Sequence, residues 1–347
     1  MKTIKHNTLA ILAFTMTAPA YAATSLEISG AIEIEAGFNS DYQDIKTSDI
    51  SLATVELGID SQINDRINGH LVLLHEEDDT SLEIDEGTFS INMNNGWSLT
   101  AGQMYIPFGS YESNMVSDPL TLELGESRES AILVGYEANS LYASAYVFNG
   151  DTIETSAALK GENTIEHIGL SVGKIFENDK YTLDVGVDYI NSIGDTDGVF
   201  DNLTSATDHD ADASTADIST LQSYVSGIAF HWIYNRDALS FIAEHVKSDN
   251  FQAVELSFKG QGATPSATNI ELGYAFEWGA AAIGYQATGE AVNLGLPETR
   301  ILFSVSHEIF ENTSLSYEHA SDKDYSVADG GSGGDGSTST IQLAVSF

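Results

Sequence analysis

The stretch Ser25-Leu-Glu-Ile-Ser-Gly-Ala-Ile-Glu-Ile-Glu-Ala-Gly-Phe38 decides the fold of this chain, because its side chains alternate between apolar and polar. The even-numbered positions hold mainly isoleucine, leucine and phenylalanine, and the odd-numbered positions include Glu27, Ser29, Glu33 and Glu35. A β-strand turns successive side chains to opposite faces. This period of two therefore predicts a long strand with one apolar and one acidic face.

The same alternation returns along the rest of the chain. Further apolar faces are predicted at positions 53–59, 89–93, 97–101, 132–136, 141–147, 168–172, 181–189, 224–232, 239–243, 270–278, 281–285, 301–305, 315–317 and 341–347. With a less regular segment at residues 67–75, the count is about 16 strands, an even number within the range of bacterial outer-membrane barrels.

The connections between these strands alternate in length. Short turns are predicted near residues 64–65, 94–96, 138–140, 177–180, 234–237, 279 and 311–312, with Asn95-Gly96 a strong hairpin signal. Long polar loops separate them, at residues 149–164, 191–220, 246–269, 288–299 and 321–337. Short turns on one side and long loops on the other are typical of an outer-membrane barrel, with the periplasm below and the medium above.

Hydropathy agrees with a barrel rather than with membrane helices. The mean hydropathy is −0.09, and after residue 22 no apolar run approaches the ~18 residues that a membrane helix needs. A barrel that alternates lipid-facing and lumen-facing residues has the same average as a soluble protein. We therefore predict an all-β fold, a transmembrane antiparallel up-and-down β-barrel that occupies residues 23–347.

Residues 1–22 have the pattern of a secretory signal peptide, with Lys2 and Lys5, an apolar run, and Ala20-Tyr21-Ala22 as the cleavage site. We expect the exported chain in the bacterial outer membrane, in contact with its lipid. The chain carries 13 Lys and Arg against 52 Asp and Glu, so its charge has the wrong sign for nucleic acid. It contains no cysteine, which excludes disulfides and thiolate metal sites, and we expect no cofactor.

One long connection, Gln103-Met-Tyr-Ile-Pro-Phe-Gly-Ser-Tyr-Glu-Ser-Asn-Met-Val-Ser-Asp-Pro-Leu-Thr-Leu-Glu-Leu-Gly-Glu126, is too apolar for an ordinary external loop. Its apolar side chains need a surface to pack on, and Pro107 and Pro119 keep it from pairing as a central strand. We predict a loop near residues 106–128 that folds back into the barrel. Its charged residues Asp118, Glu123, Glu126 and Arg128 are candidates for a pore constriction, although the loop could instead only stiffen the wall.

Strand parity places a dozen carboxylates on the lumen side. They are Glu27, Glu33, Glu35, Glu56, Asp60, Glu86, Asp184, Asp188, Glu271, Glu277, Glu308 and Glu318. Lys and Arg fall mainly in loops, turns or strand ends, so we predict a lumen that attracts cations. The alternative is that these acids merely hydrate a wide lumen.

Aromatic residues mark one end of the barrel. Trp97, Trp232 and Trp278 lie next to short turns, and the chain ends in Phe347. Aromatic side chains gather at membrane interfaces, so we predict an aromatic girdle on the periplasmic side.

A family resemblance supports the same reading. The C-terminal Gln342-Leu-Ala-Val-Ser-Phe347 resembles the last strand by which the barrel insertion machinery reads outer-membrane proteins. Gly102-Gln-Met-Tyr-Ile-Pro-Phe-Gly109, residues 115–126 and Tyr146-Val-Phe-Asn-Gly-Asp151 resemble the LbtU-type siderophore porin family, and the Pro-Phe-Gly element is more distantly similar to phosphate-selective porins. The resemblance implies ferric siderophore uptake without a plugged TonB-type receptor, and a homotrimer is plausible for such a barrel.

Other functions stay open at this stage. A general cation-selective diffusion porin fits the lumen charge, and an adhesive or structural barrel fits the long loops. A lipid hydrolase is disfavoured, because Gly169-Leu-Ser171-Val-Gly173 lies within an alternating strand and no sharp turn follows it. The acidic loop at residues 191–220 lacks the spacing of an EF-hand, so we interpret it as a solvated acidic loop and predict no metal site, with weak calcium binding as the alternative.

Overall fold

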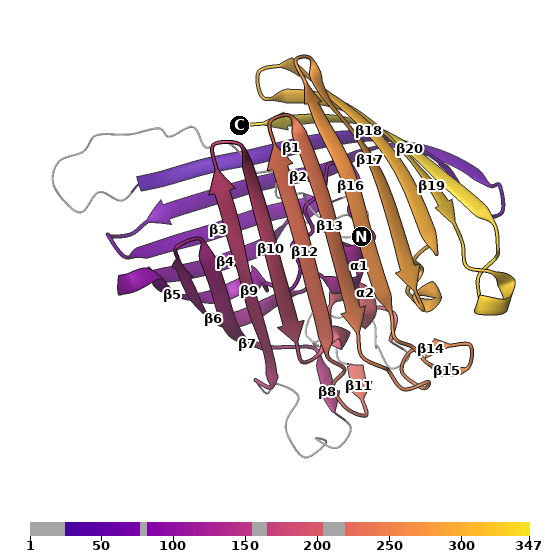
Figure 1. Ribbon diagram of the computed structural model, residues 1–347, viewed down its shortest axis with the longest axis horizontal. Helices are drawn as coiled ribbons and strands as arrows, with labels where there is room; N and C mark the ends of the chain where they lie inside the picture. Colours follow the sequence, from indigo (N-terminus) through magenta and orange to yellow (C-terminus); the bar gives the residue numbers. More distant parts are fainter. Residues whose placement is uncertain (1–24, 77–81, 155–164, 204–218) are drawn as a thin grey trace.

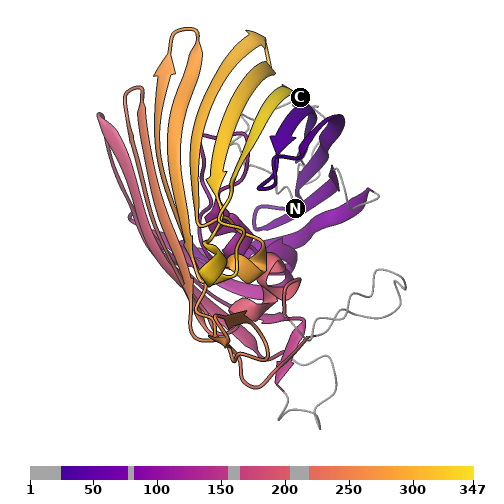
Figure 2. The ribbon, with the colours of Figure 1, turned by 90° about the vertical axis from the view of Figure 1, so that its right-hand side faces the viewer.

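The computed structural model describes residues 25–76, 82–154, 165–203 and 219–347, which form a closed antiparallel barrel of 16 strands (Figures 1 and 2). The predicted fold class and strand number are therefore confirmed. The wall strands, in order around the barrel, are β1 (Ser25–Ser40), β2 (Lys46–Gln62), β3 (Ile67–Glu76), β4 (Glu83–Asn92), β5 (Trp97–Tyr105), β6 (Arg128–Ala138), β7 (Leu141–Asn149), β9 (His167–Asn178), β10 (Tyr181–Ile190), β12 (Gly227–Arg236), β13 (Leu239–Ser248), β16 (Ser266–Phe276), β17 (Gly279–Gly289), β18 (Thr299–Phe310), β19 (Thr313–Lys323) and β20 (Asp335–Ser346).

The barrel closes where the first strand meets the last. Residues 31–40 of β1 pair antiparallel with residues 346–337 of β20. Beyond β20, the backbone of Phe347 exchanges two hydrogen bonds with Gly30, with N···O distances of 2.9 and 3.0 Å. Closure leaves no unpaired edge, which is what allows a sheet to sit in lipid.

Side chains alternate between lipid and lumen as the sequence predicts. In β16, Ile270, Leu272 and Tyr274 face outward and are exposed, whereas Asn269 and Glu271 face inward and are almost fully buried. The barrel is thus apolar outside and polar inside. This is the arrangement that a lipid solvent favours.

Short turns and long loops lie at opposite ends of the barrel, as predicted. The hairpins β9–β10, β12–β13 and β16–β17 turn tightly at the upper end in Figure 1. The long connections at the other end contain the parallel pair β8 (Thr152–Glu154) and β11 (Ser219–Leu221), and the pair β14 (Ser257–Phe258) and β15 (Gln261–Gly262). They also contain η3 (Ile193–Asp195), α2 (Asp197–Phe200), η4 (Val292–Leu294) and η5 (Val327–Asp329).

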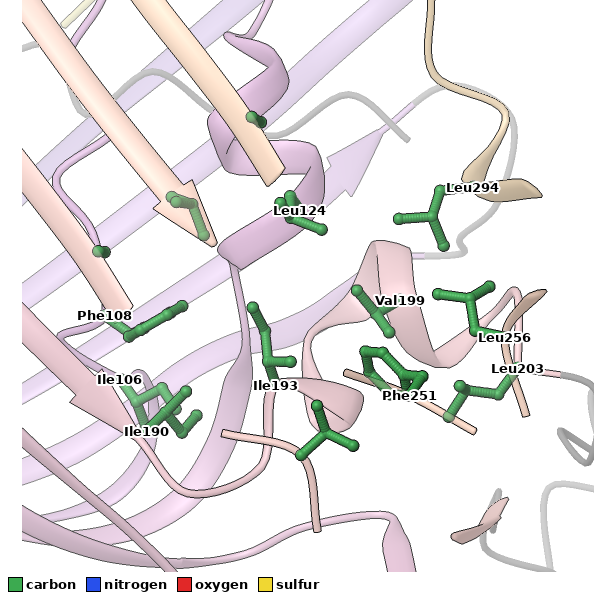
Figure 3. Close-up of a cluster of buried hydrophobic side chains, with 14 of the residues drawn as sticks. Ile106, Phe108, Leu124, Ile190, Ile193, Val199, Leu203, Phe251, Leu256 and Leu294 are labelled. Atoms are coloured by element: carbon green, nitrogen blue, oxygen red, sulfur yellow. The ribbon is translucent and has the colours of Figure 1, made fainter. Parts of the chain in front are cut away.

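The long connections pack on one another through an apolar cluster at this end. Val199, Leu203, Phe251, Leu256 and Leu294 come together there from three connections (Figure 3). The cluster continues inward to residues of the loop that follows β5, including Ile106 and Phe108. The loop end of the barrel therefore has a core of its own.

Two predictions fall outside the described residues, namely the signal peptide at 1–22 and the acidic run Asp208-His-Asp-Ala-Asp212. Within the described ranges, no helix has the length and apolar character to cross a membrane. In the same ranges, no group of three or more His, Cys, Asp or Glu side chains is arranged to hold a metal ion.

Candidate functional site

The loop between β5 and β6 folds into the barrel, as predicted. We call residues 106–127 the infolded segment. It contains one short helix, α1 (Leu120–Gly125), and its side chains Ile106, Phe108, Met115 and Leu120 are buried. Gly109 has a left-handed backbone with φ of 89°, and a side chain at this position would overlap the ring of Tyr111. A glycine therefore permits the sharp change of direction where the segment meets the wall.

Wall carboxylates hold the segment by its backbone. Asp188 on β10 accepts a hydrogen bond from Gly109 N at 3.0 Å. Glu244 on β13 accepts from Ser110 N at 2.7 Å and from Tyr111 N at 3.2 Å. Buried backbone N–H groups need acceptors, and these two carboxylates supply them, so the contacts fix the start of the segment.

Two further carboxylates hold the tip of the segment. Glu271 on β16 accepts from Asn114 N at 2.6 Å and from Ser113 Oγ at 2.8 Å. Glu318 on β19 accepts from Val116 N at 2.5 Å and from the Ser117 hydroxyl at 2.5 Å. Both acids lie near the middle of their strands. The segment therefore crosses the lumen side of the wall at mid-height.

The return path runs through α1, which contacts β13, β16 and β17. Thr121 Oγ1 donates to Glu244 at 2.6 Å, so this one carboxylate binds both the outgoing and the returning chain. At the loop end, Asp197 N donates to Glu126 O at 2.9 Å and Thr196 Oγ1 donates to Leu124 O at 2.9 Å. The segment is thus joined to the apolar cluster at the loop end.

These contacts change the interpretation of the predicted lumen acids. Asp188, Glu271 and Glu318 do face inward, but they bind the infolded segment instead of standing open to water. The sequence could not show this, because the partners lie far away in the chain. The three acids therefore face inward, as their strand parity predicts, and they anchor the infolded segment.

A second group of inward-facing acids lies on the wall between β1 and β4. It consists of Glu27, Glu33, Glu35, Glu56, Asp60 and Glu86 on β1, β2 and β4, and we call it the acidic lane. Strand pairing aligns Glu27 with Asp60, and Glu33 and Glu35 with Ala344 and Gln342 of β20. All six share the inward parity that the sequence predicts.

Neutral and titratable side chains connect members of the acidic lane. Gln342 Nε2 donates to Glu33 at 3.2 Å and to Glu35 at 3.0 Å. His70 lies 2.8 Å from Asp60 and 4.0 Å from Glu86. The acidic lane therefore keeps a high density of negative charge along one side of the lumen.

The remaining acids that were predicted for the lumen wall lie in three different environments. Asp184 faces inward on β10 and accepts from Tyr142 Oη at 2.8 Å. Glu308 is exposed close to the turn end of β18. Glu277 lies in the turn between β16 and β17 and is exposed, so its assignment to the wall was wrong. Alternation continues through Trp278, and for that reason the sequence did not reveal where β16 ends.

The four residues predicted as candidates for a pore constriction do not lie together. Asp118 and Glu126 are buried within the infolded segment, and only Glu123, on α1, is partly exposed. Arg128 shares the strand parity of the outward-facing Ile132 and Val134. Its Nη1 lies 2.7 Å from both Glu83 and Asp85. The Arg128 side chain therefore forms an ion-pair cluster with Glu83, which pairs with the inward-facing Leu74, and its predicted place at the constriction stays a prediction.

A cavity of about 460 Å³ lies on the turn side of the segment's tip. Glu33 and Gln342 line it from β1 and β20, and Asn114 and Val116 line it from the tip. The rest of its wall is mainly Ala and Ser, from β17, β18 and β19 and from the hairpin between β12 and β13 with the neighbouring part of β16. Small side chains on this wall leave open space beside the segment.

The predicted girdle residues lie at the turn end on the outer surface. Trp97 begins β5 and packs on Tyr136 with ring centroids 4.9 Å apart. Trp278 stacks on Phe276 at 5.2 Å in the β16–β17 turn region. Trp232 and Phe347 are about half exposed. This placement suits an interfacial belt, which remains a proposal.

Two inward residues escaped the sequence analysis although parity could have revealed them. Glu244 follows the outward positions 239, 241 and 243 by one residue, and Arg300 precedes the outward Ile301. Arg300 Nε and Nη2 bind the two oxygens of Asp322 at 2.7 and 2.8 Å. An electrostatic interaction also links Arg300 to Glu123. A basic residue therefore lies close to Glu123, the partly exposed acid of α1.

Ser171 of the hydrolase-like pattern lies within β9, paired with Ser144 and Asp188 of the neighbouring strands. It occupies no strand-to-helix turn. A nucleophile elbow needs that turn to expose its hydroxyl, so the hydrolase interpretation loses its structural basis.

No protein-family model matches the chain. A UPF0422 protein of Legionella pneumophila strain Philadelphia 1 is 27% identical over 335 residues, which cover 87% of this chain and 60% of that protein. A UPF0422 protein of Coxiella burnetii is 27% identical over 317 residues, which cover 86% of this chain and 64% of that protein. The chain thus spans about 60% of the length of the curated relatives it matches.

Solved structures resemble the whole barrel. Salmonella typhi OmpF in complex with daunomycin has a TM-score of 0.64 at 12% identity, covering 93% of this chain and 98% of that one. The outer-membrane channel DcaP of Acinetobacter baumannii has a TM-score of 0.63 at 12% identity, covering 95% and 100%. The fold is that of the 16-stranded outer-membrane porins. The resemblance to LbtU-type siderophore porins remains a prediction.

Proposed function

We propose that this protein is an outer-membrane porin through which small solutes diffuse, with a preference for cations. The observation that carries the proposal is that the acids on the lumen wall fall into two groups with different roles. Anchoring carboxylates on β13 and β19 hold the infolded segment, and the six further inward-facing acids of the acidic lane lie on β1, β2 and β4. A segment that covers part of a polar lumen narrows it without filling it, and the remaining wall charge is negative.

Single-channel recording tests passage against a closed adhesive barrel. The folded protein is inserted into planar bilayers at 0.1 M KCl, and its folding is confirmed by gel mobility. We expect discrete conductance steps, because water-filled barrels of this strand number conduct ions. Folded protein that inserts but gives no steps would favour the adhesive alternative.

The more specific part of the proposal is that ferric siderophores are among the solutes that pass. Because the acidic lane would repel an anionic polycarboxylate chelate, we infer that any ferric siderophore that passes is neutral or cationic. Growth on neutral and anionic ferric siderophores as sole iron source, with and without the gene, checks this. Gene-dependent growth on the anionic chelate alone would contradict the inference.

A homotrimer is proposed from the fold. Vibrio cholerae OmpT, described in a trimer form, has a TM-score of 0.59 at 12% identity, covering 94% of this chain and all of that one. Light scattering of the detergent-solubilised barrel measures the mass directly. A mass of one chain would reject the trimer without affecting the proposed passage.

A further inference from the structure

A second recess lies inside the barrel, apart from the acidic lane. It is enclosed by the lumen faces of β6, β7, β9, β10 and β12 and by Pro107–Ser110 of the infolded segment. Its volume is about 420 Å³, which is within the ~300–1,000 Å³ range of small-molecule sites.

Tyr142, Asp184 and His231 form a hydrogen-bonded group in this recess. Tyr142 Oη donates to Asp184 Oδ1 at 2.8 Å and lies 3.0 Å from His231 Nε2. A side chain at Gly173 would overlap the Tyr142 ring, and one at Gly186 would overlap His231. The two glycines therefore let both rings lie against the wall, which holds the polar atoms in place.

Two polar atoms at this recess have no hydrogen-bond partner among the residues that the structure describes. His231 is 95% buried, with a relative exposure of 5%, and its Nδ1 atom makes no hydrogen bond. The hydroxyl of Ser144, which also lines the recess, is buried and makes none either. Buried polar groups usually have a hydrogen-bond partner, so unpaired polar atoms beside an open space indicate a binding place for a polar ligand.

The charged side chains that line the recess indicate which kind of ligand fits it. Glu137, Asp184 and Asp188 contribute carboxylates, and no Lys or Arg is among the lining residues. Asp188 is already bound to Gly109, whereas the side chain of Asp184 is 27% exposed. The nearby hydroxyls and the carboxylate of Asp184 accept hydrogen bonds. A positive group that carries N–H donors therefore fits better than one that has none.

We propose that this recess binds small organic cations with a primary ammonium group, and that Asp184 is the principal contact. The inference deepens the proposed function, because it names a solute class for the same lumen. Binding itself does not depend on passage, so the two can be tested separately.

Saturation-transfer NMR on the folded full-length barrel in detergent, at low salt, measures binding of propylammonium. Tetramethylammonium has the same charge but no N–H donor and serves as the ligand control. We expect Asp184→Asn to weaken propylammonium binding about tenfold and Tyr142→Phe to weaken it a few-fold. Glu308→Gln, which removes one lumen-side carboxylate outside the recess, should change binding less than twofold.

Three results would overturn the proposal, namely no binding to the folded wild type, equal affinity for both ammonium ions, or equal losses in Asp184→Asn and Glu308→Gln. The last two would indicate diffuse attraction by the lumen. The reversal potential of the same protein is measured independently. Cation preference without propylammonium binding would reject only this site, and binding without conductance would reject only the proposed porin function.

Discussion

At the scale of single residues, carboxylates on the lumen wall act in two different ways. Asp188, Glu244, Glu271 and Glu318 hold backbone N–H groups, whereas the acidic lane adds negative charge to the lumen faces of β1, β2 and β4. Changing Glu33, Glu35 and Glu56 together to Gln should lower the preference for K⁺ over Cl⁻ by about twofold or more, because each carboxylate contributes to the lumen potential.

The matched control removes three charges elsewhere. Asp208, Asp210 and Asp212, changed together to Asn, lie in a loop that the sequence places outside the pore. Their effect on the reversal potential should be smaller than that of the lumen variant. Equal effects would show that the acidic lane does not determine selectivity.

Asp197 gives a pH-dependent prediction outside the wall strands. Burial, reinforced by Asp201, Asp151 and Asp85 against an opposing effect of Arg128, raises the pKa of Asp197 to about 7. The folded state thus favours the neutral acid. Its contribution to stability is fully present below the unfolded pKa of ~4 and is lost as pH rises toward 7.

Urea unfolding at pH 5 and pH 8 measures this effect. Asp197→Asn should be more stable than the wild type at pH 8 by on the order of 2 kcal/mol, and the difference should shrink at pH 5. Asp237→Asn, in an exposed turn, serves as the control. A gain for Asp197→Asn that does not vary with pH would contradict the account.

At the scale of elements, the infolded segment depends on its anchors more than on its own short helix. Glu318→Gln removes the charge that Val116 N and Ser117 share. A charge-assisted hydrogen bond contributes about 1.5–3 kcal/mol. The tip should therefore become more mobile while the barrel stays closed.

Spin labelling detects this change directly, because the chain has no cysteine and one introduced at position 116 is unique. The label should give a more mobile spectrum in Glu318→Gln than in the parent. Glu308→Gln, on the neighbouring strand β18, should leave the spectrum unchanged. Identical spectra in all three proteins would mean that other contacts hold the tip.

The strands could be predicted from sequence and the anchors could not. Alternation in β16 or β20 is a local property, and each residue reports its own side of the wall. The anchor between Val116 and Glu318 joins residues 202 positions apart, and nothing in either neighbourhood specifies the other. The ion pairs of Arg128 could not be predicted from sequence either, because the positions of its partners Glu83 and Asp85 depend on a bulge in β4.

At the scale of the whole molecule, an apolar exterior and a closed ring of strands predict a barrel that resists detergent. Closed barrels hold all backbone hydrogen bonds between neighbouring strands. An unheated sample in SDS should therefore migrate differently from a boiled one. Identical mobility before and after boiling would contradict the closed barrel.

The apolar cluster at the loop end could not be foreseen at this scale either. Val199, Leu256 and Leu294 come from three connections that composition alone marks as polar loops. Their packing depends on the wall that brings the connections together. The same wall brings the infolded segment within reach of its anchors.

The reversal potential of the wild-type channel in a KCl gradient tests the central claim most directly. The acidic lane and a Debye length of ~10 Å at 0.1 M salt predict a potential that favours K⁺ over Cl⁻, with a preference that shrinks as salt is raised. A potential that shows chloride preference at low salt would contradict the acidic lumen and the proposed function with it.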